Sequence, residues 1–117
     1  ETDIEVAKKD LRNIKKIQDS VYIKKVKSKS SIENKVEEVE KIDLSEEIDR
    51  INSHLIQIIK SIKSPELSGK KINFILQEIN RESNTILSKF LDKRVSKNAI
   101  SLKMQAEKMR EQVANIL

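Results

Sequence analysis

The stretch SEEIDRINSHLIQIIKSIKSPELSGKKINFILQEINRESNTILSK, residues 45–89, contains two apolar seams separated by the only proline and the only glycine of the chain. The apolar residues of both seams recur at steps of three, four or seven residues: Ile48, Ile51, Leu55, Ile58 and Ile62, then Ile72, Ile75, Ile79 and Ile86. This spacing places each set on one face of a helix. Because the break at 64–69 is short, the two helices are predicted to be antiparallel neighbours.

The flanking sequence predicts further helices on both sides of this hairpin. Residues 4–26 have a helical apolar pattern, a break is expected near 28–31, and residues 32–42 resume a short helix. After the hairpin, apolar residues follow a strict heptad spacing: Val95, Ala99, Leu102, Ala106, Met109, Val113 and Ile116. Ser45 and Asp92 are the predicted N-caps of the helices that follow them. The expected fold is all-α, with long helices, an antiparallel hairpin and a heptad-patterned last helix packed like a coiled coil.

We expect two segments, a basic helical segment at 1–42 and a helical domain at 43–117. The simplest arrangement is a three-helix antiparallel unit preceded by the long basic helix. We expect that helix to expose its apolar stripe, so the chain alone is not predicted to be a stable monomer. The sequence starts with Glu1, so we also expect it to be a piece of a longer protein.

Composition narrows the classes of function. The chain has 117 residues, 37% of them charged, and a formal net charge of +5. A basic chain suits a polyanion such as RNA, although an AT-rich genome also yields a Lys-, Ile- and Asn-rich protein. The absence of cysteine excludes disulfides and thiolate metal sites. No apolar run approaches a membrane span and no signal peptide is recognisable, so a cytoplasmic protein without membrane contact is expected.

The segment NFILQEINRESNT, residues 73–85, carries an unusual density of hydrogen-bonding side chains for a helix. Glu78 and Glu82 are four residues apart on one side of it, where two carboxylates repel unless they are neutralised. A divalent cation, Mn²⁺ or Mg²⁺, would neutralise them. The alternative is that cationic side chains such as Arg50 and Arg81 do so and no metal binds.

His54 is the only histidine, and it lies seven residues after Glu47 on the same side of its helix. Such a residue is either a partly buried polar side chain, or a metal ligand or general acid/base beside acidic groups. We take His54, Glu78 and Glu82 as the candidate catalytic and metal-binding residues. Candidate RNA-binding residues are the cations Arg50, Lys70, Lys71, Arg81, Lys89, Lys103 and Arg110. For Lys103 and Arg110 the alternative is ordinary ion pairing on a solvated helix. No aromatic platform for stacking bases is recognisable.

Three segments, EEIDRINSHL (46–55), GKKINFILQEINRESNTILSK (69–89) and LKMQAEKMREQVANI (102–116), resemble the C-terminal region of the YicC-like endoribonuclease family. The resemblance is close from residue 43 to 116 and loose over 1–42, and the family's N-terminal domain is absent. It implies a cytosolic bacterial protein that cleaves RNA with a divalent metal and assembles as a ring, a hexamer. The positions that match the family pattern are Glu46, Glu47, Arg50, His54, Gly69, Phe74, Gln77, Glu78, Asn80, Arg81, Glu82, Asn84, Thr85, Ser88, Lys89, Lys103, Arg110, Glu111, Gln112 and Asn115.

The chain also departs from the family pattern. Asn73, Arg94 and Ser101 stand where the family usually has acidic residues, and Leu87 replaces a small one. Loss of carboxylates weakens any metal site that used them. Three functions are therefore weighed: part of a metal-dependent endoribonuclease, a non-catalytic helical module for oligomerisation or RNA binding, and a plain coiled coil. The polar cluster at 77–85 argues against the plain coiled coil, which needs no such residues.

Overall fold

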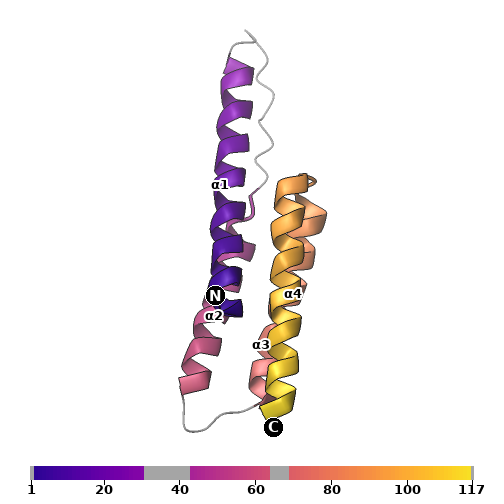
Figure 1. Cartoon of the computed structure of the whole chain (residues 1–117). Helices are drawn as coiled ribbons and strands as arrows, with labels where there is room; N and C mark the ends of the chain where they lie inside the picture. Colours follow the sequence, from indigo (N-terminus) through magenta and orange to yellow (C-terminus); the bar gives the residue numbers. More distant parts are fainter. Residues whose placement is uncertain (1, 31–42, 64–68, 117) are drawn as a thin grey trace.

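A computed structural model describes residues 2–30, 43–63 and 69–116, with the side chains of 21–30 and 115–116 left out of the description. Within these ranges the chain forms helices and no strands: α1 (Asp3–Ser30), α2 (Ser45–Lys63), α3 (Gly69–Lys89) and α4 (Lys93–Ile116). Consecutive helices alternate in direction, and α1 extends past the adjoining ends of α3 and α4 (Figure 1). None of the described helices combines the length and the apolar character of a membrane span.

The helices pack in the spatial order α1, α4, α3, α2. Helix α4 lies along both α3 and α1, and α2 lies along α3, whereas α1 touches α2 only lightly. Each helix contributes buried apolar side chains to a single core: Ala7, Leu11, Ile14, Leu44, Ile51, Leu55, Ile58, Ile72, Ile75, Leu76, Ile79, Ile86, Phe90, Val95, Ala99, Leu102, Ala106 and Met109. Helix α1 therefore shares one core with the helices that follow residue 43.

The antiparallel hairpin and the heptad helix are confirmed. The predicted seam residues of α3 are buried, as are the α4 residues of the heptad from Val95 to Met109. In α2 the seam is buried from Ile51 to Ile58, but Ile62 is 58% exposed near the C-terminal end of the helix. The helical pattern thus predicted the inward face of these helices correctly. It did not predict that Ile62, near the end of the bundle, is exposed.

The role expected for the first helix was wrong. Leu11 and Ile14 are buried, and Ile4 and Ile17 pack against the core, so α4 covers the apolar stripe that was expected to be exposed. The described chain is thus a four-helix arrangement, not a three-helix unit with a helix before it. Helix α1 continues through Ser30, so it extends into the region 28–31 where a break was expected. The helix expected at 32–42 lies outside the described residues, and the homo-oligomer stays a prediction.

An aspartate lies shortly before the first residue of α2 and of α4. The Asp43 carboxylate accepts a hydrogen bond from the backbone N–H of Ser45 at 2.9 Å, so Asp43 and not Ser45 caps α2. At α4 the predicted cap is confirmed, because Asp92 Oδ1 accepts from the backbone N–H of Arg94 at 2.8 Å. The Arg94 guanidinium also donates to the same carboxylate, through Nε at 3.2 Å and Nη2 at 2.9 Å. The hydrogen bond from the Arg94 side chain is the largest cause that lowers the pKa of Asp92 to about 2.

Replacing Asp92 by Ala should lower the free energy of unfolding by about 1 kcal/mol, because α4 loses its cap. Asp92→Asn keeps the capping oxygen and removes only the charge. Since the folded-state pKa lies below the usual 3.8, the contribution of the charge is present above pH 3.8 and is lost as the pH falls toward 2. Urea unfolding at several pH values should therefore show the wild type and Asp92→Asn converging in acid. A gap of constant size from pH 7 to 2 would contradict this assignment.

Candidate functional site

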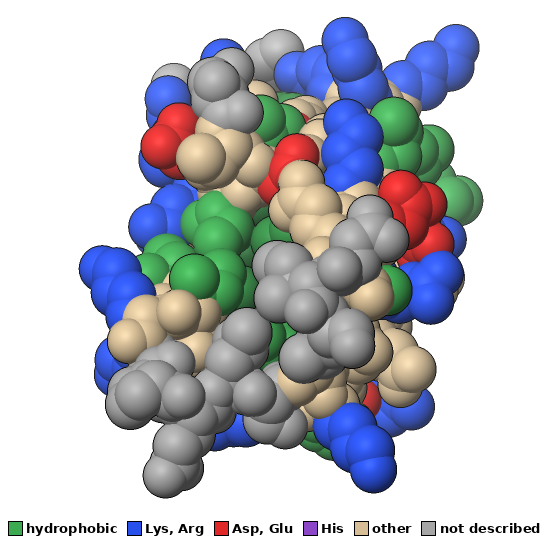
Figure 2. All heavy atoms as spheres, turned by 60° about the horizontal axis from the view of Figure 1, so that its bottom comes forward, with side chains coloured by type: hydrophobic (Ala, Val, Ile, Leu, Met, Phe, Trp, Pro, Cys, Tyr) green, Lys and Arg blue, Asp and Glu red, His purple; other side chains and the backbone are tan. Residues whose placement is uncertain are grey.

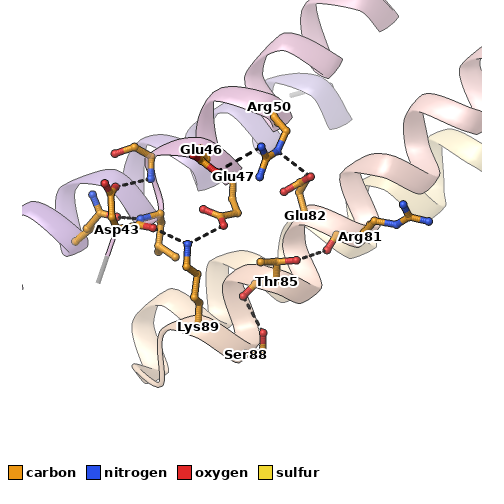
Figure 3. A network of polar contacts seen from close by, with 12 residues as sticks. Asp43, Glu46, Glu47, Arg50, Arg81, Glu82, Thr85, Ser88 and Lys89 are labelled. Atoms are coloured by element: carbon orange, nitrogen blue, oxygen red, sulfur yellow. Dashed lines mark hydrogen bonds and ion pairs between the residues drawn. The ribbon is translucent and has the colours of Figure 1, made fainter. Parts of the chain in front are cut away.

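A network of charged side chains crosses the contact between α2 and α3 near the start of α2 (Figure 3). Glu47 is almost fully buried, with 4% of its side chain exposed, and its Oε1 lies 2.9 Å from Lys89 Nζ. Lys89 also donates to the backbone carbonyl of Asp43 at 2.9 Å. The second carboxylate oxygen of Glu47 is buried without a hydrogen-bond partner. Lys89 therefore neutralises a buried charge and connects the end of α3 to the start of α2.

A second ion pair lies beside the first. Arg50 of α2 donates from Nε to Oε1 of Glu82 on α3 at 3.0 Å, and its Nη1 lies 3.6 Å from Oε2 of Glu46. Glu82 is buried, and its hydrogen bond with Arg50 is the largest cause that raises the pKa of the guanidinium. The polar contacts of Arg50 and Lys89 fix how α2 and α3 lie against each other lengthwise.

This register puts His54 of α2 at the same level as Glu78 of α3, one helical turn beyond the pair Arg50 and Glu82. His54 is half-buried, and its Nδ1 atom is buried without a hydrogen-bond partner. Glu78 has 21% of its side chain exposed and lies 3.7 Å from the Arg81 guanidinium. Two of the three predicted catalytic residues, His54 and Glu78, thus lie at one level of the two helices. Glu82 lies one turn away and pairs with Arg50.

The three residues do not fit a metal ion in this arrangement. Among the described residues, no group of three or more His, Cys, Asp or Glu side chains is placed to hold one. Arg50 occupies Glu82, and a guanidinium beside a carboxylate repels a second cation. Neutralisation by Arg50 and Arg81, the alternative to a metal, is what the side chains do here. Mn²⁺ or Mg²⁺ at His54, Glu78 and Glu82 stays a prediction, and it requires Arg50 to leave Glu82.

Six of the seven predicted RNA-binding cations fall into two groups, and the seventh, Lys71, also has an interaction within the structure. Within the described part of the chain, those engaged with a carboxylate are Arg50, Arg81, Lys89 and Arg110. Arg110 pairs with Glu107 in the same helix, so the ordinary ion pairing weighed for it is what the structure has. Lys70 and Lys103 have no carboxylate partner among the described residues, and Lys70 is exposed. The sequence pattern could not distinguish paired from unpaired cations, because partners on another helix depend on how α2 and α3 align lengthwise.

Two lysines were missed by the sequence reasoning. Lys60 and Lys63 lie in the last turn of α2, next to the first turn of α3, which carries Lys70 and Lys71. We call these four residues the basic end. Lys60, Lys63 and Lys70 are exposed and have no ion-pair partner in the described ranges. Viewed from this end of the bundle, Lys and Arg side chains surround the rim, with fewer carboxylates between them (Figure 2). Because these lysines lie on both sides of the Pro–Gly break, the sequence could have predicted that the hairpin brings them together.

The polar segment 77–88 of α3 has two faces with different roles. Glu82 and Ser83 point inward, and the Ser83 hydroxyl donates to the carbonyl of Ile79 at 2.8 Å. The outward side chains line a shallow depression on the helix surface: Gln77, Asn80, Arg81, Asn84, Thr85 and Ser88. The polar residues of this segment thus have two positions. Glu82 forms the ion pair with α2 on the inner face, and the outward side chains form an open polar surface.

Two of the positions that depart from the family pattern have local partners. Arg94 pairs with Asp92, and Ser101 hydrogen-bonds Asp10 of α1. Asp10 is buried, and burial is the largest cause that raises its pKa. A carboxylate at position 101 would face the carboxylate of Asp10, so serine avoids a buried like-charge contact.

Replacing Lys89 by Met should lower the free energy of unfolding by about 1–3 kcal/mol, because Glu47 is left as a buried charge without a partner. Adding Glu47→Gln should recover part of this loss. Lys97→Met is the control, since Lys97 is exposed and unpaired within the described chain. Chemical denaturation of the wild type, Lys89→Met, Glu47→Gln, the double variant and Lys97→Met measures the coupling. If Lys89→Met is no less stable than Lys97→Met, the buried pair does not hold the hairpin.

Comparison with known proteins agrees with the sequence resemblance. The family described as endoribonuclease YicC-like, C-terminal, matches residues 2–117. The chain is 39% identical over 77 residues to a probable endoribonuclease YicC of Haemophilus influenzae, covering 66% of this chain and 27% of that protein. It is 42% identical over 77 residues to one of Clostridioides difficile, covering 66% and 26%. The match thus spans about a quarter of each relative's length. The chain belongs to the YicC-like endoribonuclease family, whose C-terminal region it matches.

Proposed function

We propose that this chain is an RNA-binding helical part of an endoribonuclease and that its basic end holds the phosphate backbone. Phosphate contacts by Lys and Arg dominate the affinity of proteins for nucleic acids. The cations of the α2–α3 network are already neutralised by Glu47 and Glu82. Lys60, Lys63 and Lys70 are exposed without such partners among the described residues.

The first turn of α3 is the observation that carries this proposal. A helix N-terminus bears partial positive charge, so acidic side chains are favoured there. Here the first turn holds no acidic residue and instead holds Lys70 and Lys71. The partial positive charge of the helix N-terminus and the lysines together favour an external anion such as an RNA phosphate.

Replacing Lys60, Lys63 and Lys70 together by Ala should weaken RNA binding and flatten its salt dependence. Each phosphate contact with a single strand contributes about 0.7 to the slope of log K against log salt, so the slope should fall by about 2. Fluorescence anisotropy with a labelled single-stranded RNA at 50–200 mM salt measures both quantities. The matched control replaces three other exposed lysines, Lys16, Lys93 and Lys97. An equal loss of slope in the control would show that net charge alone, and not the basic end, binds RNA.

A second proposal concerns cleavage and rests on the unpartnered Nδ1 of His54 at the level of Glu78. A histidine beside a carboxylate can transfer protons during cleavage of a phosphodiester bond. We assign His54 and Glu78 to such a role in the whole protein, and we assign Glu82 to holding Arg50.

Glu78→Gln and Glu82→Gln separate these roles. We expect Glu78→Gln to abolish RNA cleavage with little change in the melting temperature, because its ion pair with Arg81 is exposed and weak. Glu82→Gln should lower the melting temperature, because a buried partner of Arg50 loses its charge. Gel assays of RNA cleavage with and without Mn²⁺ or Mg²⁺ and thermal unfolding give the two readouts. Undiminished cleavage by Glu78→Gln would remove Glu78 from the catalytic assignment.

A further inference from the structure

The outward face of α3 carries hydrogen-bonding groups and almost no charge. From its first turn, one line of side chains follows helical spacing of four and three residues: Lys70, Phe74, Gln77, Arg81, Asn84 and Ser88. Asn80 and Thr85 flank this line within the depression described above. Beyond Lys70, Arg81 is its only charged member, although 37% of the chain is charged. A merely solvated helix face would be expected to carry Lys and Glu here.

The polar groups of this face are free to accept a ligand. The amides of Gln77, Asn80 and Asn84 make no side-chain hydrogen bond to any described residue. Thr85 Oγ1 donates to the carbonyl of Arg81 at 3.2 Å, and Ser88 Oγ donates to that of Thr85 at 3.0 Å. Their donors are used within the helix, so the hydroxyl oxygens remain as acceptors.

Phe74 lies on the same face and is 62% exposed. An exposed phenyl ring offers a flat surface on which a base can stack. The sequence showed no recognisable aromatic platform for bases. In the fold, the exposed ring of Phe74 lies one turn beyond Lys70 and one turn before Gln77. A flat ring beside amide groups is the arrangement that unpaired bases bind.

We propose that this outward face of α3 binds a single-stranded segment of RNA. One base stacks on Phe74, and the amides of Gln77, Asn80 and Asn84 hydrogen-bond base edges and 2′-hydroxyl groups further along the helix. The proposal rests on the proposed function, because the strand that reaches this face is the one whose phosphates the basic end holds. Lys70 belongs to both surfaces and joins them.

The chemistry of the face favours a single strand over a duplex. A duplex presents its phosphates outward and is bound mainly through cations, and beyond Lys70 the line of side chains on this face offers only Arg81. Unpaired bases present neutral donors and acceptors and a stacking surface, which match amides and a phenyl ring. Glu78, the carboxylate nearest this face, has only 21% of its side chain exposed and lies beside Arg81, so little negative charge opposes the strand.

The test uses Phe74→Ala, the double variant Gln77→Ala/Asn84→Ala, and Ile62→Ala as the matched control. Ile62 is a comparably exposed apolar residue, at 58%, on another helix. Anisotropy is measured with an unstructured single-stranded RNA, the same sequence as DNA, and an RNA duplex, each at several salt concentrations. Circular dichroism and melting temperature confirm that the variants fold, and Phe74→Trp provides a variant that retains stacking.

We expect Phe74→Ala to weaken single-stranded RNA binding about tenfold, with Phe74→Trp near wild type and Ile62→Ala unchanged. The salt slope should stay the same, because no phosphate contact is lost, whereas the lysine variants change it. The double amide variant should narrow the preference for RNA over DNA. Unchanged affinity of Phe74→Ala, or an equal effect on the duplex, would overturn the proposal while leaving the basic end intact. A changed molecular mass without changed RNA affinity would overturn it in favour of a protein contact.

Discussion

Two carboxylates are buried where α2 meets α3, and the rest of the site follows from how each is neutralised. Glu47 forms an ion pair with Lys89, and Glu82 forms one with Arg50, and both pairs connect α2 to α3. Breaking such a pair is costly because an uncompensated buried charge remains. The pairs therefore fix one lengthwise register of α2 on α3. That register places His54 at the level of Glu78 along the two helices.

The same constraint divides the charges of the chain by function. Cations near the start of α2 and the end of α3 pair with internal carboxylates. Lys60, Lys63 and Lys70, where α2 ends and α3 begins, have no such partners among the described residues. The two ends of the hairpin thus differ in free charge, although both are rich in Lys and Arg. This supports the proposed RNA-binding surface at one end and on the adjoining face of α3, and it is consistent with the proposal that Glu82 holds Arg50.

Much of the fold was contained in local patterns. The steps of three and four residues and the Pro–Gly break predicted the hairpin, and Asp92 predicted the start of α4. The place of α1 was not predictable in this way, because the apolar stripe of Leu11 and Ile14 does not say which helix covers it. The site was predicted only in part. His54, Glu78 and Glu82 were proposed from residue type and spacing, but the pairing of Glu82 with Arg50 on another helix depends on the tertiary register.

A charge swap tests most directly whether the ion pairs set this register. Arg50→Glu and Glu82→Arg are each placed in the chain alone and then together, and thermal unfolding is measured for all three. The account predicts that each single variant is clearly destabilised, since like charges then face each other in the α2–α3 contact, and that the double variant regains much of the wild-type stability. A double variant as unstable as the sum of the two single variants would show that the pair is not coupled. The division of charges on which the RNA-binding proposal depends would then lose its basis.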